Sequence, residues 1–134
     1  MDCIFCKIIK GEVPCDKVYE DDKTLAFLDI RPVNKGHILV VPKHHCEDVL
    51  AAPELELKNS IIVIQKVAKA MVEAVKADGW NIGVNNGEAA GQVVFHTHFH
   101  IIPRYKTDGL IHWPHTEYSK GESKKIAENI KKKL

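Results

Sequence analysis

Three histidines, His96, His98 and His100, alternate with Thr97 and Phe99 in one short segment. In a β-strand successive side chains point to opposite faces, so an extended chain here would place all three imidazoles on one side and the residues between them toward a core. Near neutral pH an imidazole can act as a nucleophile, as a general acid or base, or as a metal ligand. The alternation therefore predicts a strand with a chemical site on one face. Three exposed or purely metal-bound histidines are the less favoured interpretation.

A second group of reactive side chains lies near the N-terminus, where Cys3 and Cys6 form a Cys-x-x-Cys pair. This spacing suits half of a zinc site, a redox pair or two reduced core cysteines. A redox pair is expected after a strand in a βαβ pattern, and no such pattern precedes these residues. A closed zinc site would need two more ligands, which His44, His45 and His96 are available to supply.

Asp29 and the loop of residues 86–92 are weaker candidates. Asp29 follows an apolar segment, so its carboxylate can either stabilise a turn or accept two hydrogen bonds from a ribose diol; on its own, the turn role is favoured. In the loop, Gly87, Gly91 and Gln92 could offer backbone amides to a phosphate. Their spacing matches neither the P-loop nor the dinucleotide-binding motif.

The segments that must position these residues predict an α+β domain. Residues 17–20 and 24–28 flank two aspartates, which are typical turn residues, and together they predict a β-hairpin. Residues 37–42 predict a buried strand that ends at a proline. Residues 80–85 predict a further strand before the histidine segment.

In residues 54–78 the apolar side chains recur with the period of an α-helix. Their apolar side chains form one stripe, made of Leu57, Ile61, Ile64, Ala68, Met71 and Val75. Pro53 suits the first turn of a helix, and Gly79 suits the stop at its C-terminal end. We predict one long amphipathic helix over this range.

The C-terminal residues predict a second helix. Ser119 and Glu122 have the spacing of a capping box at a helix start. We therefore expect residues 1–118 to form a single domain that carries the histidine site. Residues 119–134 would form a helical tail that packs on this domain or extends from it.

Composition excludes several classes of protein. The chain has 134 residues, which suits one domain, and its 19 Lys plus Arg against 18 Asp plus Glu give a formal net charge of +1. This balance argues against a nucleic-acid partner. No apolar stretch reaches the roughly 18 residues that a membrane span needs. No signal peptide is visible, so we expect a cytoplasmic protein whose cysteines are reduced.

The segment from His96 to Ile101 resembles the His-x-His-x-His-x signature of the histidine triad (HIT) family of nucleotide hydrolases and transferases. The resemblance extends from Cys3 to about Arg104, and its supporting segments are residues 3–9, 25–30, 36–43 and 85–92. It implies an α+β fold with a five-stranded antiparallel sheet and one long helix. It also implies a homodimer in which the long helices pair and the two sheets join.

The resemblance implies separate roles for the three histidines, and we expect all three to belong to the catalytic site. His98 would be the nucleophile, attacking the α-phosphorus to form a nucleotidyl-histidine that water then cleaves. A carbonyl that accepted the Nδ1 proton of His98 would leave its Nε2 free for this attack. His100 falls where the family contacts the phosphate. His96 would also be a metal ligand.

The implied cofactor is a structural zinc ion held by four protein side chains, Cys3, Cys6, His45 and His96. Four protein ligands leave no open position, which makes such a site structural. His45 is preferred to His44 because its offset from the preceding Pro-Lys pair matches the family pattern.

The resemblance also implies a nucleotide-binding site. The nucleoside contacts fall on Ile4, Phe5, Ile8, Phe27, Leu28, Asp29, Ile30 and Leu39. The residues that would line the phosphate side of the site are Asn85, Gly91, Gln92 and Val94. In this setting Asp29 would take the ribose hydroxyls. One residue departs from the pattern, because Val93 stands where the phosphoramidase branch often carries a serine that could assist the leaving group.

We therefore predict a hydrolase or nucleotidyl transferase that cleaves purine nucleoside 5′-monophosphate derivatives, phosphoramidates or adenylates, with an AMP-type nucleotide as substrate or product. Residues 112–114 resemble the Hint branch, the nucleoside phosphoramidases. Residues 102–104 and 108–109 are instead similar to the Fhit-like branch, the dinucleoside polyphosphate hydrolases. The Cys-x-x-Cys pair and the short chain favour the Hint branch. A nucleotide-binding or adaptor protein with vestigial activity is the alternative from another class.

Overall fold

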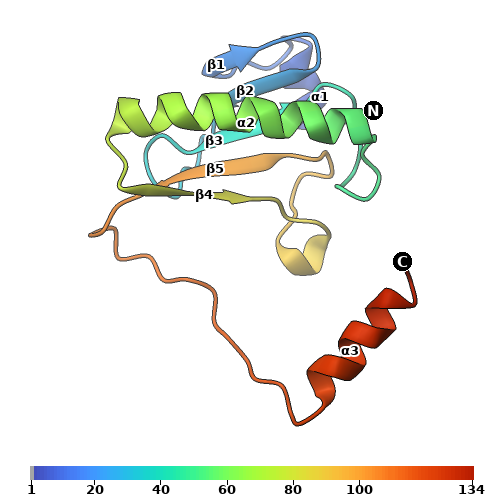
Figure 1. Cartoon of the computed structure of the whole chain (residues 1–134). Helices are drawn as coiled ribbons and strands as arrows, with labels where there is room; N and C mark the ends of the chain where they lie inside the picture. The colour runs from blue at the N-terminus through green and yellow to red at the C-terminus, as the bar shows by residue number, and fades with distance from the viewer. Residues whose placement is uncertain (1) are drawn as a thin grey trace.

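The protein is described from a computed structural model that covers residues 2–134. Five antiparallel strands form one sheet in the order β1-β2-β3-β5-β4, with a long helix lying across one face (Figure 1). The strands are β1 (Lys17–Glu20), β2 (Thr24–Leu28), β3 (Ile38–Pro42), β4 (Gly79–Gly83) and β5 (Phe99–Arg104). The helices are α1 (Ile4–Ile9), α2 (Glu54–Val75) and α3 (Glu122–Lys131), with a short 3-10 turn, η1 (Glu88–Ala90). The predicted α+β plan is confirmed.

Both faces of the central strands are covered. On one face, Val40 of β3 and Ile101 of β5 pack against Ile64 and Met71 of α2. On the other face, apolar side chains of β2 and β3 pack against Phe5 of α1. Burying each such aliphatic or aromatic side chain contributes about 1.5–3 kcal/mol. α1 covers only part of this second face.

The long helix ends earlier than the sequence predicts. α2 stops at Val75, and Lys76 takes the left-handed conformation at φ 53° and ψ 48° with its N–H bonded to the Val72 carbonyl. A left-handed residue at this position satisfies a free helix carbonyl, although a lysine pays about 1–2 kcal/mol that a glycine would not. Gly79, predicted as the helix stop, instead begins β4 opposite Arg104. The predicted helix end was therefore wrong by a few residues.

The histidine segment is only partly a strand. β5 begins at Phe99, so His100 lies in the strand while His96 and His98 lie in the irregular segment before it. The physical reason is Thr97, whose N–H and hydroxyl both donate to the Cys46 carbonyl at 2.7 and 3.1 Å. This loop contact replaces the ladder that a strand would make. The prediction of one strand through all three histidines was wrong, yet the rings of His96 and His98 still lie on the α1 side, against Phe5.

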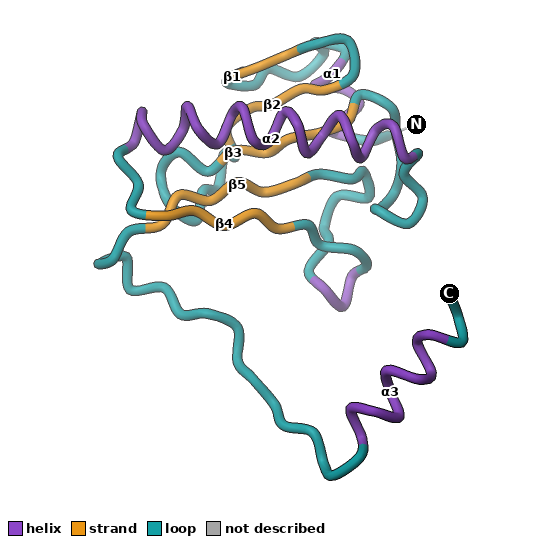
Figure 2. Tube along the Cα trace, in the orientation of Figure 1, coloured by secondary structure: helices purple, strands orange, loops and turns teal. Residues whose placement is uncertain are grey.

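The C-terminal residues leave the sheet. The tube in Figure 2 shows a long extended stretch after β5 that leads to α3, which stands clear of the sheet, and every residue from 111 to 134 is exposed. Glu122 Oε1 accepts the Ser119 N–H at 3.0 Å, which is one half of the predicted capping box, but the helix itself begins at Glu122. The proposed boundary between residues 118 and 119 stays a prediction. In the described range, no helix combines the length and apolar character needed to cross a membrane.

Candidate functional site

A cavity of about 770 Å³ opens between α1 and the uncovered part of the sheet. Its walls include every residue assigned to nucleotide binding except Gln92, and they end at His98 and His100. Most of the lining is apolar, which suits the faces of a purine ring. Elements far apart in the sequence, α1, β2, β3 and the loop before β5, therefore meet around one cavity.

Gln92 lies behind this wall and holds the loop together. Its Oε1 accepts the Gly87 N–H at 2.8 Å, and its Nε2 donates to the Glu47 carbonyl at 2.6 Å and to the Val94 carbonyl at 3.1 Å. Each side-chain atom is thus already used within the protein. Its contribution to a phosphate site would be to shape the loop rather than to contact a ligand.

The cavity has one wall that the sequence analysis missed. Residues 13–16, just before β1, also line it. The Leu28 N–H donates to the Asp16 carbonyl at 3.0 Å, so the predicted hairpin already carries this segment to the end of β2. Extending the pairing of β1 with β2 by one residue, from Lys17 back to Asp16, would have placed this segment at the end of β2.

Asp29 makes the turn contact that the sequence favoured, and it also lines the cavity. Its Oδ1 accepts the Arg31 N–H at 2.8 Å, which stabilises the turn after β2. Its Oδ2 lies 3.6 Å from His37 Nε2, and the side chain lines the cavity. One carboxylate oxygen is therefore occupied by the turn, while the other lies near His37 beyond hydrogen-bond distance.

His98 is held with its proton on the nitrogen that faces away from the cavity. Its Nδ1 lies 2.6 Å from the His96 carbonyl, and because a carbonyl only accepts, Nδ1 must donate. Burial lowers the pKa of His98, so the ring is neutral at pH 7 and Nε2 keeps its lone pair. The edge-on Phe5 ring, 4.9 Å away between centroids, fixes its orientation.

His100 lies beside it, with the two ring centroids 5.1 Å apart. Its Nδ1 lies 2.9 Å from His37 Nε2, and its own Nε2 is buried without a hydrogen-bond partner among the described residues. Burial, followed by the nearness of His98 and His37, lowers the pKa of His100 to about 4. We call His98 and His100 the histidine pair.

His37 is the polar residue that the sequence analysis did not assign to the site. It was predicted only as the first residue of a strand, but β3 begins at Ile38 and His37 is 3% exposed beside Asp29 and His100. The available signal was a histidine directly next to an apolar strand. Antiparallel pairing of β3 with β5 brings it to His100, and pairing cannot be read from one segment.

Four further ligating atoms converge behind the histidine pair. Cys3 Sγ, Cys6 Sγ, His45 Nδ1 and a nitrogen of His96 lie within 4.8 Å of one another, and we call these residues the metal cluster. Cys3 Sγ is 3.5 Å and His45 Nδ1 is 3.1 Å from His96 Nδ1. Ligands of a tetrahedral zinc ion are separated by about 3.3–3.8 Å, as follows from bond lengths of about 2.0–2.3 Å. The cluster therefore has the dimensions and donor atoms of a zinc site.

The orientation of His96 supports this reading of the cluster. Its Nε2 donates to the Pro42 carbonyl at 2.8 Å, which leaves the lone pair on Nδ1 pointing at the cysteines. Metal-bound histidines usually make such an outer hydrogen bond. His44 is exposed and outside the cluster, so the geometry selects His45 between the two neighbours.

Comparison with known proteins assigns the chain to a family. Residues 10–107 match the family model described as HIT domain. The chain belongs to this family. It is 41% identical over 136 residues to an adenosine 5′-monophosphoramidase of Schizosaccharomyces pombe, covering 100% of this chain and 99% of that protein. Relatives of the Hint type are thus among its matches.

Two solved structures extend the comparison. A HIT family protein from Bacillus subtilis shares 45% sequence identity and superimposes with a TM-score of 0.93, covering 100% of this chain and 98% of that one. A zinc-bound histidine triad family protein from Mycobacterium smegmatis shares 36% identity with a TM-score of 0.79, covering 100% and 99%. The resemblance predicted from the histidine segment is therefore confirmed at the level of family and fold.

Proposed function

We propose that this protein is a nucleotide hydrolase or nucleotidyl transferase that cleaves purine nucleoside 5′-monophosphate derivatives, phosphoramidates or adenylates, at the α-phosphorus. The observation that carries the proposal is a neutral His98 with a free Nε2 in the wall of an apolar, nucleoside-sized cavity. Membership of the HIT family and the phosphoramidase relative support the same activity.

The geometry suggests how a substrate would bind. The base would lie between the apolar side chains of α1 and β2, and the free Oδ2 of Asp29 would accept a ribose hydroxyl. This arrangement brings the 5′-phosphate to the histidine pair at the end of the cavity. An apolar slot with a few directed polar atoms is the usual form of a small-molecule site.

The reaction would then proceed in two displacements at phosphorus. In the first, the Nε2 lone pair of His98 forms a bond to the α-phosphorus, and the P–N or P–O bond to the leaving group breaks, its electron pair departing with the leaving group. In the second, a water oxygen forms a bond to the same phosphorus, and the bond to Nε2 breaks with its electron pair returning to Nε2, which releases the nucleoside monophosphate. The attacking water gives one proton to solvent, and the leaving group of the first step takes one up from solvent. Splitting one difficult displacement into two is the general advantage of a covalent intermediate.

The metal cluster would hold a structural zinc ion. All four positions are filled by protein atoms, so no position remains open for substrate. A metal here would tie α1 to the segment that carries His98, two residues after His96. The zinc-bound relative from Mycobacterium smegmatis supports this choice of metal.

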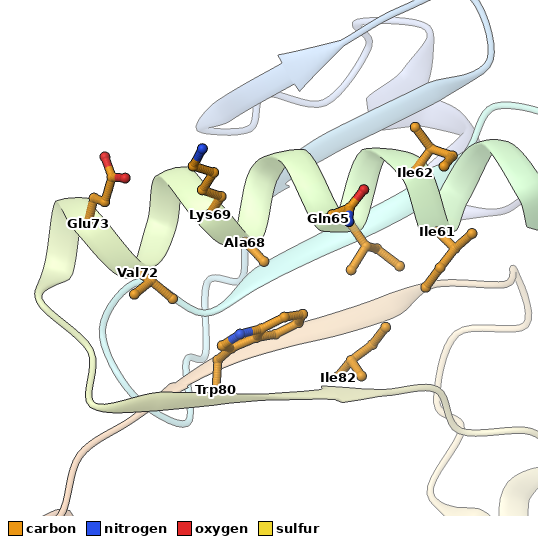
Figure 3. A pocket seen from close by; sticks show the side chains of 10 residues that line it. Ile61, Ile62, Gln65, Ala68, Lys69, Val72, Glu73, Trp80 and Ile82 are labelled. Carbon is orange, nitrogen blue, oxygen red and sulfur yellow. The ribbon is translucent and has the colours of Figure 1, made fainter.

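A homodimer would cover an exposed apolar groove between α2 and β4. Figure 3 shows Ile61 of α2 with Trp80 and Ile82 of β4 along a groove between the helix and the edge strand, and these side chains are 40–51% exposed. A second copy placed here would pair the long helices and adjoin the edge strands. Ile62, which lines the same groove, is 61% exposed, and Val18 of β1 is an exposed apolar residue outside it. Ile62→Glu should give a monomer by light scattering, whereas Val18→Glu should not. A dimer that persists in Ile62→Glu would contradict this interface.

One experiment tests the proposed chemistry directly. Protein mixed with an adenylate donor labelled in its phosphate is quenched, and the labelled peptide is identified by mass spectrometry. We expect the label on His98, and label on any other residue would overturn the mechanism. If the protein cleaves diadenosine polyphosphates far faster than adenosine phosphoramidate, the Fhit-like assignment replaces the Hint-like one.

A further inference from the structure

The chain leaves the sheet at a fixed point beside an edge strand. The carboxylate of Asp108 accepts from Arg104 Nε at 2.8 Å and from the Leu110 N–H at 3.0 Å. Arg104 also donates to the Leu110 carbonyl at 3.2 Å and to the Asn81 side chain of β4 at 2.8 Å. These bonds hold Leu110 near β4, the last strand in the order of the sheet. Residues 111–134, which we call the tail, therefore start at this edge.

Among the described residues, the tail makes hydrogen bonds only within itself. Its helix α3 has 10 residues, and isolated helices shorter than about 12–15 residues are marginal in water. Ile126 and Ile130, four residues apart, lie on one face of α3 with Leu134 a turn beyond, and all three are exposed. Such a helix gains stability by packing its apolar face on another surface. Its own domain does not provide that surface, because α3 stands clear of it (Figure 1).

The path of the tail is shared with a solved relative. The HIT family protein from Bacillus subtilis superimposes over 100% of this chain with a TM-score of 0.93. Each superimposed residue adds at most one part in 134 to such a score, so residues 1–110 alone could supply no more than 110/134, about 0.82. Much of the tail must therefore superimpose as well. A segment that follows the same path in two proteins without contacting its own domain is held by something outside that domain.

A groove of about 280 Å³ between β1 and the C-terminal half of α2 has the chemistry to receive α3. Its lining is mainly apolar, and Lys66, whose ammonium lies 5.1 Å from the centre of the Tyr19 ring, is its charged residue. Ala70 and Ala74 are exposed along the α2 wall, and small side chains there let a second helix approach closely. The groove lies at the β1 edge of the sheet, whereas the tail leaves at the opposite edge. It is therefore open to a helix from another chain.

The course of the tail fits the groove of a second copy. A two-fold axis beside β4 would pair two β4 strands antiparallel and turn the second copy end for end. The tail begins near the C-terminal end of α2, where Tyr105 Oη donates to the Val75 carbonyl, and it runs toward the other end of the sheet (Figure 1). The groove of a copy turned in this way would lie at that other end.

The tail is also long enough to reach this groove. From β4 of one copy to β1 of the other there are five strand spacings, about 24 Å at about 4.8 Å each. Residues 111–121, which precede α3, can span about 36 Å when they are extended. The stretch before α3 therefore covers the distance with length to spare.

We propose that α3 of one copy docks in the groove between β1 and α2 of a second copy, reciprocally, with Ile126 and Ile130 packed against the alanines of the other chain. Charge favours the contact, because the tail has six lysines and three glutamates, a formal charge of +3, which leaves −2 for residues 1–110 of a chain whose total is +1. The docked helix would brace β1, which directly follows the cavity wall of residues 13–16. This inference goes beyond the proposed function and rests on it only for the presence of a second copy.

The first test identifies the chain and the surface that α3 contacts. A photoreactive benzoylphenylalanine takes the place of Ile130 in the full-length protein. The same group in place of Glu128, which points to the opposite side of α3, is the matched control. After irradiation, we expect the probe at position 130 to give a cross-linked dimer whose linked peptide contains residues 66–75. A link within one chain, a link to another surface, or an equal yield from position 128 would overturn the proposal.

The second test measures the docking without a probe. Hydrogen exchange read by mass spectrometry should show the amides of α3 protected by roughly tenfold or more relative to an unstructured chain. Ala70→Lys places a long charged side chain in the groove at an exposed position, so we expect most of this protection to be lost while the fold survives. Ala51→Lys adds the same charge at an exposed position outside the groove and should leave α3 protected. Equal protection in the two variants would contradict docking in this groove.

Further outcomes separate the docking from the proposed dimer interface. If Ile62→Glu is a monomer in which α3 stays protected, a second copy is not what α3 contacts, and the docking alone fails. If Ile62→Glu stays a dimer whose probe at position 130 still links to residues 66–75, the interface between α2 and β4 fails and the docking stands. Protection that appears only after vesicles of anionic lipid are added would assign α3 to a membrane surface and overturn the docking. These measurements do not depend on nucleotide turnover.

Discussion

The metal cluster and the histidine pair use imidazoles that are two residues apart in the chain but held by different nitrogens. In the metal cluster, His96 binds the Pro42 carbonyl through Nε2 and turns Nδ1 toward the cysteines. In the histidine pair, His98 binds the His96 carbonyl through Nδ1 and leaves Nε2 for the cavity. The neighbouring acceptor or donor, rather than the residue type, therefore determines what each histidine can do.

The largest expected effect is a loss of turnover when the histidine pair loses the imidazole of His98. His98→Ala removes the imidazole that keeps a lone pair on Nε2 in the cavity wall, and we expect turnover to fall by about 10³-fold or more. AMP binding, measured by calorimetry, should persist because the apolar walls remain. His44→Ala, which removes an exposed histidine outside the site, is the control and should keep its activity. Substantial turnover by His98→Ala would show that another group attacks phosphorus.

Loss of the metal cluster should act first on stability. Cys3→Ser removes one of four ligands, so we expect bound zinc to be lost and the free energy of unfolding to fall by about 3 kcal/mol or more. Zinc content and denaturant unfolding measure the two effects. Cys15→Ser, a half-buried thiol outside the cluster, should retain its metal. Equal metal content in both variants would mean that the cluster is not the metal site.

The histidine pair should make the fold sensitive to mild acid. Burial lowers the pKa of His100 to about 4, below the value of 6.5 for an unperturbed histidine. The unfolded chain therefore binds a proton before the folded one does, so this contribution to stability is complete above about pH 6.5 and is lost as the pH falls toward about 4. His100→Gln should flatten this part of the curve of unfolding free energy against pH.

Zinc held by the metal cluster would add its own pH dependence, because the ligands bind metal only when they are deprotonated. Both proteins are therefore measured at equal zinc content, so that the difference between their curves reports His100 alone. Parallel curves over the whole range would remove His100 as a source of acid sensitivity.

The smallest effect is expected at the rim of the cavity. Val93 is 86% exposed and lines the cavity beside the histidine pair. Val93→Ser restores the hydroxyl that the phosphoramidase branch often carries, and we expect a few-fold rise in kcat for adenosine phosphoramidate. Because the side chain is exposed, unfolding free energy should change by less than about 0.5 kcal/mol. Val93→Ala is the matched control, and an equal rise in that variant would assign the effect to size rather than to the hydroxyl.

Local patterns in the sequence were enough for most of the fold. The apolar stripe through Ile64 and Met71 predicted α2, and the turn aspartates predicted the hairpin of β1 and β2, because both depend on residues close together in the chain. The end of α2 at Lys76 was missed, since nothing local marks a lysine for the left-handed conformation. The start of β5 was missed because Thr97 bonds to a loop about fifty residues away.

The sequence alone determined the family, the residue types of the site and the spacing of its ligands, because these are properties of the chain and need no knowledge of its path. The tertiary structure places His45, which the sequence analysis preferred to His44, in the metal cluster, and it alone shows that His37 lies against His100. It also decided which ring nitrogen of each histidine is free. A tautomer depends on the one atom that each nitrogen meets, and those atoms come from distant segments that only the folded sheet brings together.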